Sequence, residues 1–258
     1  AELARRFRCG LVLESATWRA SADWGARLGY SRDPLRELNR KAIRLLEEIR
    51  AGYESAETTV VISGCVGPRG DGYSPQDMMS EPGAEAYHRD QVQTFAETSA
   101  DMVTAITMNY VEEAVGIAQA ARQACIQVAI SFTVERDGKL ATGQSLRAAI
   151  EKVDAVTSAY PAYYMINCAH PTHFAGIMTP GESWTRRIRG LRANASSKSH
   201  AELNESSALD SGNPIELASQ YAELKQRLSD LTVLGGCCGT DHRHVEQIAN
   251  ACVPMFKR

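Results

Sequence analysis

Short apolar runs alternate with longer amphipathic runs along nearly the whole chain, and this alternation constrains the fold most strongly. The short runs have the length and composition of strands: Leu11–Glu14, Thr59–Ser63, Met102–Thr107, Gln127–Val134, Tyr163–Asn167, Gly190–Asn194 and Leu231–Gly235. Helical patterns follow most of them, over Pro34–Gly52, Gly83–Ser99, Val111–Ala124, Gln144–Ser158, Pro214–Ser229 and His242–Val253. Repeated β-then-α units of this kind predict a parallel sheet with helices outside it.

The number of predicted strands is one short of a (β/α)8 TIM barrel. The first residues, Ala1–Gly10, have the pattern of a helix that ends at a glycine, so we expect the first strand to lie upstream. We therefore predict an α/β fold, a (β/α)8 barrel without its first strand, as a single domain over residues 1–258. A doubly wound sheet is the alternative, but no Gly-x-Gly-x-x-Gly turn follows an early strand. Asp33 and Asn213, each before a proline, are predicted helix N-caps.

Composition excludes several functional classes. The formal charge of −3 and the pI near 6.1 provide no basic field for nucleic acid. The only basic concentration, Trp184–Arg192, is predicted to be a solvated connection that enters a strand. No N-terminal apolar segment and no run of 18 apolar residues is present, so we expect no membrane partner. The 7 cysteines are an odd number for a disulfide framework, which favours free thiols in the cytoplasm. A homo-oligomer remains open.

The segment Leu231–Thr240 ends in two adjacent cysteines that are bounded by glycines, Gly-Gly-Cys-Cys-Gly. Consecutive strand residues point to opposite faces, so Cys237 and Cys238 can face one target only if the strand breaks there. The glycines permit that break, and Thr240 or Asp241 can then cap a following helix. Two thiols on one tight turn make a soft metal chelate.

A third cysteine occupies a similar position. Cys168 ends another short apolar run and is followed by His170-Pro171. Strand ends of a barrel meet at one face, so we predict that Cys168 joins Cys237 and Cys238. Three thiolates leave zinc, which prefers four tetrahedral ligands, with one open position, as in catalytic sites. These cysteines are therefore the predicted metal ligands and catalytic residues. Without metal, we expect them to oxidise to a bridge that involves Cys168.

Other candidate ligands have simpler interpretations. Cys65 follows a strand in Ser63–Pro68 and is predicted to be a small residue in a Gly/Pro loop, with a ligand role as the alternative. His170 and His173 are predicted to support or cap the metal site rather than bind the metal. The remaining cysteines, Cys9, Cys125 and Cys252, are predicted core residues.

Together these motifs resemble the homocysteine S-methyltransferase family of zinc-dependent barrels. The matching segments are Ile166–Cys168, Gly235–Thr240, Ser63–Pro68, Ser131–Thr133 and Leu140–Leu146. The resemblance implies that Zn²⁺ on the three cysteines lowers the pKa of a substrate thiol and keeps it nucleophilic. The thiolate would attack a methyl group on an onium centre or a methylated folate. The implied partners are homocysteine and a methyl donor.

The resemblance is incomplete at the amino-acid pocket. Ile106 stands where the family carries an acid that helps hold the substrate ammonium, and the Asp-Gly-Gly motif of the first strand is missing. Glu112 or Glu113 would compensate, although acids in the first turn of a helix have a simpler role. The alternatives to homocysteine methylation are methylation of a different thiol and a catalytically inactive zinc-binding barrel with a scaffold or sensing role.

Three further residues are predicted to contact substrate. Asn167 precedes Cys168, and Thr107 corresponds to the threonine that follows the family's acid. Trp18 is placed to meet an onium donor through a cation–π contact, with ordinary rim packing as the alternative. The segment Ala195–Gly212 is long for a βα connection, and two interpretations stay open: a lid or donor-binding loop, and a disordered surface insertion.

Overall fold

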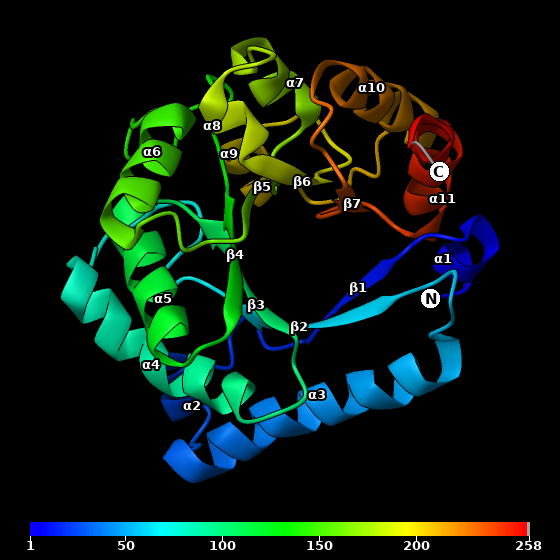
Figure 1. The fold of residues 1–258 in the computed structure, drawn as a ribbon. Coiled ribbons are helices and arrows are strands. Elements are labelled where there is room, and N and C mark those ends of the chain that lie inside the picture. Colours follow the sequence, from blue (N-terminus) through cyan, green and yellow to red (C-terminus); the bar gives the residue numbers. More distant parts are fainter. Residues whose placement is uncertain (257–258) are drawn as a thin grey trace. The chain divides into compact units, whose positions relative to one another are not determined.

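The structure, a computed structural model, describes residues 1–256. The described strands form one seven-stranded sheet in the sequential order β1 to β7 (Figure 1). Parallel strands in this order, alternating with helices, confirm the predicted fold class, a (β/α)8 barrel with one strand fewer. Two compact units are distinguished, Ala1–Ser131 with Lys152–Ala162, and Phe132–Glu151 with Tyr163–Arg258. The assignment to a single domain stays a prediction.

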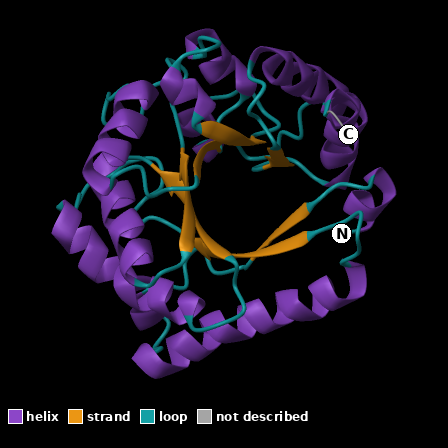
Figure 2. Cartoon of the chain, viewed as in Figure 1, coloured by secondary structure: helices purple, strands orange, loops and turns teal. Residues whose placement is uncertain are grey.

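The first unit contains β1, β2 and β3 in parallel pairing, with Leu11 opposite Val60 and Ser63 opposite Met102. Helices flank these strands (Figure 2). Ile43, which is fully buried, belongs to its core. The elements are α1 (Glu2–Phe7), β1 (Leu11–Glu14), α2 (Ala22–Arg27), α3 (Arg32–Tyr53), β2 (Val60–Val66), α4 (Glu81–Ala96), β3 (Met102–Met108), α5 (Val111–Gln123) and most of β4 (Gln127–Phe132); α6 (Leu146–Thr157) has residues in both units.

The second unit carries the C-terminal strands. Strands β5, β6 and β7 are parallel, and their register aligns Asn167, Arg192 and Gly235 side by side. Its elements are β5 (Tyr163–Asn167), α7 (Pro171–Phe174), η1 (Ala175–Ile177), α8 (Ser183–Arg186), β6 (Ile188–Ala193), α9 (His200–Asn204), α10 (Pro214–Arg227), β7 (Val233–Gly236), α11 (His242–Cys252) and η2 (Val253–Met255).

Strand β2 is longer than predicted because of a tertiary contact. It continues through Gly64 and Cys65 to Val66, so Cys65 lies inside a strand and not in a loop. A Cβ atom on Gly64 would lie 2.5 Å from the ring of Phe95 on α4, so glycine allows the helix to approach the strand closely. The predicted Gly/Pro loop at Cys65 is therefore wrong.

Several helix ends also differ from the prediction. Helix α1 ends at Phe7, and its left-handed C-cap is Arg8, at φ 54, and not Gly10. The N-cap of α3 is Ser31, which leaves Asp33 in the first turn. The Asn213 cap of α10 is confirmed, since its side chain accepts hydrogen bonds from two backbone N–H groups.

The basic segment Trp184–Arg192 is not a solvated connection. Trp184 is buried in the short helix α8, and β6 begins at Ile188, before the predicted Gly190. The segment Ala195–Gly212 carries helix α9, whose start is fixed by a capping box of Ser199 and Glu202. Within residues 1–256, no helix has both the length and the apolar character needed to span a bilayer.

Candidate metal and active site

The first arm of the site is the end of β5. The strand stops at Asn167, and Cys168 has left-handed backbone dihedrals, with φ 53. Left-handed backbone is uncommon for a residue other than glycine, and it turns the chain sharply after the strand. Cys168 is buried, and its N–H donates to the carbonyl of Arg192 at 3.1 Å.

The second arm is the turn after β7. The Cys237 N–H donates to the carbonyl of Ala193 at 2.9 Å, which extends the pairing of β7 with β6. Gly239 supplies the left-handed residue of the turn at φ 79, and the Thr240 hydroxyl donates to the Cys237 carbonyl at 2.7 Å. Asp241 then caps α11. Cys237 and Cys238 are thus presented from one turn.

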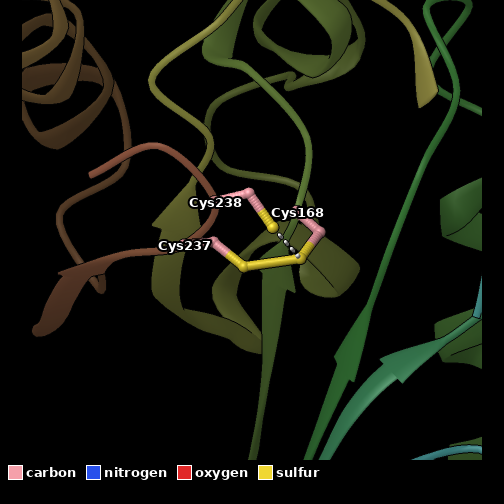
Figure 3. A group of neighbouring side chains, drawn as sticks. All are labelled: Cys168, Cys237 and Cys238. Atoms are coloured by element: carbon pink, nitrogen blue, oxygen red, sulfur yellow. Dashed lines mark hydrogen bonds between the residues drawn. A yellow bond between two sulfur atoms is a disulfide. The ribbon is translucent and has the colours of Figure 1, made fainter. Parts of the chain in front are cut away.

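The two arms bring three sulfur atoms together (Figure 3). The Sγ atoms of Cys168, Cys237 and Cys238 all lie within 4.8 Å of one another, and those of Cys168 and Cys238 are 3.9 Å apart. Ligands about 2.3 Å from a tetrahedral zinc ion are separated by about 3.8 Å, so this donor set fits such an ion. Cys168 and Cys237 are joined as a disulfide, with Cα atoms 5.5 Å apart. A metal would require this bridge to be reduced.

Asn194, at the end of β6, connects the two arms. Its Nδ2 donates to the Cys168 carbonyl at 2.9 Å, and its Oδ1 accepts the Cys238 N–H at 3.1 Å. The side chain is buried. Sequence analysis did not single out this residue for the site, although its place at the end of a parallel strand between two cysteine-bearing strands was a usable signal.

A family model described as homocysteine S-methyltransferase matches residues 10–252, nearly the whole chain. The chain belongs to the homocysteine S-methyltransferase family. The resemblance inferred from the motifs is confirmed.

Three solved structures of the homocysteine methyltransferase MmuM from Escherichia coli share the fold of this family member. The TM-scores are 0.72 for the metallated form, 0.73 for the oxidised form and 0.64 for the apo form, at 19%, 18% and 20% identity. The alignments cover 96% of this chain and 82%, 82% and 81% of those chains, respectively. No curated relative matches the chain. At this identity the structural likeness establishes the fold.

The histidines near Cys168 have structural partners. His170 is the N-cap of α7, and burial, with the neighbouring His173, lowers its pKa to about 4. His173 Nε2 lies 2.9 Å from the Ser197 carbonyl. His200, which sequence analysis did not identify, places Nε2 2.6 Å from the Cys168 carbonyl. These contacts agree with supporting roles for His170 and His173.

A positive charge lies beside the cysteines of this family member. Arg192 on β6 donates through Nε to the Gly236 carbonyl at 3.3 Å. Burial lowers the pKa of its guanidinium, while nearby Tyr221 and Cys238 act in the opposite direction. Arginine remains protonated at neutral pH even so. Its charge therefore favours thiolates at the cluster.

The predicted substrate residues occupy both units. Asn167 is fully buried at the end of β5. Trp18 and Thr107 belong to the first unit: the Trp18 indole donates to the Ile106 carbonyl at 3.2 Å, and Thr107 has left-handed backbone at φ 67. The Arg19 guanidinium lies 4.4 Å from the centre of a Trp18 ring. Substrate contact by these residues stays a prediction.

Three other candidates have simpler explanations in the structure. Glu113 is fully buried, and its Oε1 accepts the Arg69 N–H at 2.8 Å and lies 2.8 Å from His88 Nε2. Glu112 is exposed in the first turn of α5. Cys65 is buried in β2, and burial raises the pKa of its thiol to about 12. A thiol in this environment is a poor metal ligand.

The three cysteines predicted to lie in the core differ in burial. Cys252 is buried as predicted, Cys9 is only partly buried, and Cys125 is exposed, so the prediction is wrong for Cys125.

Proposed function

We propose that this family member transfers a methyl group to a thiol at a zinc ion held by Cys168, Cys237 and Cys238. Homocysteine is the proposed acceptor, and methionine the product. The observation that carries the proposal is the cluster of three sulfurs within 4.8 Å at the ends of β5 and β7. Because the site needs reduced thiols, the proposed location is the cytoplasm.

The chemistry follows from the charge of the donor set. Zinc held by the three thiolates would carry a formal charge of −1 and would lower the pKa of an incoming thiol, which would lose its proton to solvent while keeping most of its nucleophilicity. The substrate thiolate attacks the methyl carbon of the donor, the new carbon–sulfur bond forms as the donor bond breaks, and the electron pair leaves with the donor. Asn194 keeps the two cysteine arms together, and Arg192 offsets part of the negative charge.

A different thiol is the second candidate, and Ile106 favours it. This residue is buried on β3 at the point where the family resemblance places an acid. A buried ammonium without its partner costs on the order of 3 kcal/mol, or more than about a hundredfold in affinity. A thiol without an amine avoids this cost, whereas homocysteine needs an acid from elsewhere.

A methylation assay on the reduced, zinc-loaded chain tests the proposal. Homocysteine is compared with the amine-free thiol 3-mercaptopropionate, each with an onium donor and with a methylated folate. We expect turnover with homocysteine, loss of turnover in Cys238→Ser, and no change in Cys125→Ser, which removes an exposed cysteine outside the cluster. A preference for the amine-free thiol would select the second candidate. No methylation of any thiol would reject both and favour the inactive zinc-binding barrel.

A further inference from the structure

The peptide unit of Cys168 is held by side chains from the segment that follows β6. His200 Nε2 lies 2.6 Å from the Cys168 carbonyl oxygen, and Asn194 Nδ2 donates to the same oxygen at 2.9 Å. Because a carbonyl only accepts hydrogen bonds, Nε2 is the donor in the first contact. The Cys168 N–H donates to the backbone carbonyl of Arg192 at 3.1 Å. Both backbone polar groups of Cys168 are therefore fixed.

The conformation of Cys168 depends on such contacts. A left-handed backbone at φ 53 is unfavourable for a residue with a Cβ atom, and it persists where the surroundings over-determine it. The turn at this residue directs its sulfur toward Cys237 and Cys238 (Figure 3). Groups that hold the Cys168 peptide therefore also hold its sulfur within the cluster.

His200 is itself oriented by its neighbours. Its Nδ1 lies 3.0 Å from Glu135 Oε1, and its side chain is only 10% exposed. A carboxylate, like a carbonyl, only accepts hydrogen bonds, so both ring nitrogens act as donors in this arrangement. Helix α9 begins at His200, and the capping box of Ser199 and Glu202 fixes the helix start. Glu202 also pairs with Arg136, which follows Glu135 in the sequence. In this orientation Nε2 faces the Cys168 carbonyl at 2.6 Å, with the Thr133 hydroxyl 3.5 Å away.

We propose that His200 is a positioning residue of the cysteine cluster: its imidazole, oriented by Glu135, fixes the Cys168 peptide so that the Cys168 sulfur faces Cys237 and Cys238. The segment Ala195–Gly212 is then a structural part of the metal site and not an independent surface insertion. The inference rests on the proposed function, because zinc is the ion that the positioned sulfurs hold.

The affinity of the reduced chain for Zn²⁺, measured by competition with a coloured chelator, tests this role. Removing an outer partner of a metal ligand lowers affinity by about 10–100-fold, and we expect a loss in this range for His200→Ala. His200→Gln retains an N–H donor that reaches the same carbonyl, so we expect affinity close to wild type. His242→Ala removes an exposed histidine on α11 and serves as the matched control. Equal affinity of His200→Ala and wild type would overturn the proposal.

A second variant keeps the test decisive if His200→Ala does not fold. Glu135 has a side chain that is 37% exposed, and Glu135→Ala removes only the orienting partner of the imidazole. We expect a smaller loss of zinc affinity, about threefold to tenfold, with an unchanged circular dichroism spectrum. A folded Glu135→Ala variant with wild-type zinc affinity would contradict the proposed orientation of His200.

A third readout needs no metal. In the metal-free chain, oxidised glutathione converts the Cys168 and Cys237 thiols to their bridge and two reduced glutathiones, and mass spectrometry measures the equilibrium. Positioned sulfurs favour the bridge, so we expect His200→Ala to shift the equilibrium about tenfold toward the thiols. If His200→Ala shows this shift but the wild-type chain binds no zinc, only the proposed function is rejected. Zinc binding by wild type, with no effect of His200→Ala on either measurement, would reject the positioning role alone.

Discussion

At Cys168 the chain passes from extended strand to left-handed backbone within one residue, and the candidate site depends on that change. A continued strand would place successive side chains on opposite faces. The turn instead leaves the Cys168 sulfur 3.9 Å from that of Cys238. The Asn194 side chain forms hydrogen bonds with the backbone of both cysteines. At this scale, hydrogen bonds to individual peptide groups determine which thiols meet.

Burial distinguishes Cys65 from the exposed cysteines Cys238 and Cys125. Burial raises the pKa of Cys65 to about 12, so near pH 8 its thiolate fraction is about a thousandfold below that of an ordinary cysteine. We expect iodoacetamide to modify Cys238 and Cys125, which are exposed, well before Cys65 in the reduced, metal-free chain. Peptide mapping by mass spectrometry measures the rates, and urea-unfolded protein is the control. Equal rates for Cys65 and Cys125 in the folded chain would contradict this account.

At the scale of elements, local sequence patterns predicted where the strands and the cysteine arms lie. They did not predict the contacts that elements make with one another. β1 and β5 have the predicted bounds because turn-forming residues flank both apolar runs. β2 does not, because the Gly64 contact with Phe95 depends on how α4 packs. His200 and Asn194 reach Cys168 across 32 and 26 positions of sequence. The hydrophobic periodicity within a strand or helix does not predict contacts at such sequence separations.

The N-cap of α10 gives a stability prediction. The Asn213 side chain accepts hydrogen bonds from the N–H groups of Ile215 and Glu216. Asn213→Ala leaves these donors without their cap, which typically costs about 1 kcal/mol and lowers the melting temperature by about 2–4 °C in a chain of this size. Asn213→Asp keeps an equivalent cap and should melt like wild type. Thermal unfolding followed by circular dichroism tests the pair, and identical melting of Asn213→Ala and wild type would be inconsistent with the cap.

The cap of α11 predicts a pH dependence. The hydrogen bond from Arg243 is the largest of several contacts that lower the pKa of Asp241 well below its usual range. The carboxylate therefore stabilises the fold fully above its unfolded pKa of about 4, and this contribution falls as pH drops toward the lower folded pKa. Asp241→Asn retains a cap without the charge, so we expect it to melt slightly below wild type at pH 7. The difference should shrink below about pH 4. A difference that stays constant from pH 7 to pH 2 would refute this assignment.

At the scale of the whole molecule, the three cysteines and their supporting residues Asn194 and His200 all belong to the second compact unit. The structure holds the Cys168–Cys237 bridge, and reduction of this bridge would leave a set of three thiols within one unit. The thiol set can hold a metal, whereas the bridge removes two of its three ligands.

Oxidation should therefore exclude zinc. We expect the chain treated with oxidised glutathione to lose its zinc, and the chain treated with a reductant to bind it again. Metal analysis combined with intact mass measures both states, and Cys125→Ser controls for oxidation elsewhere. Full zinc occupancy in the bridged chain would contradict a site that needs Cys168 and Cys237 as thiolates.

The most direct test of the central claim is X-ray absorption at the zinc edge of the reduced chain, before and after homocysteine is added. We expect three sulfur ligands at about 2.3 Å with one lighter ligand, and four sulfur ligands once the substrate thiol binds. Fewer than three sulfur ligands before homocysteine is added, or a spectrum that the thiol does not change, would contradict the proposal that Cys168, Cys237 and Cys238 hold the zinc ion that activates the substrate.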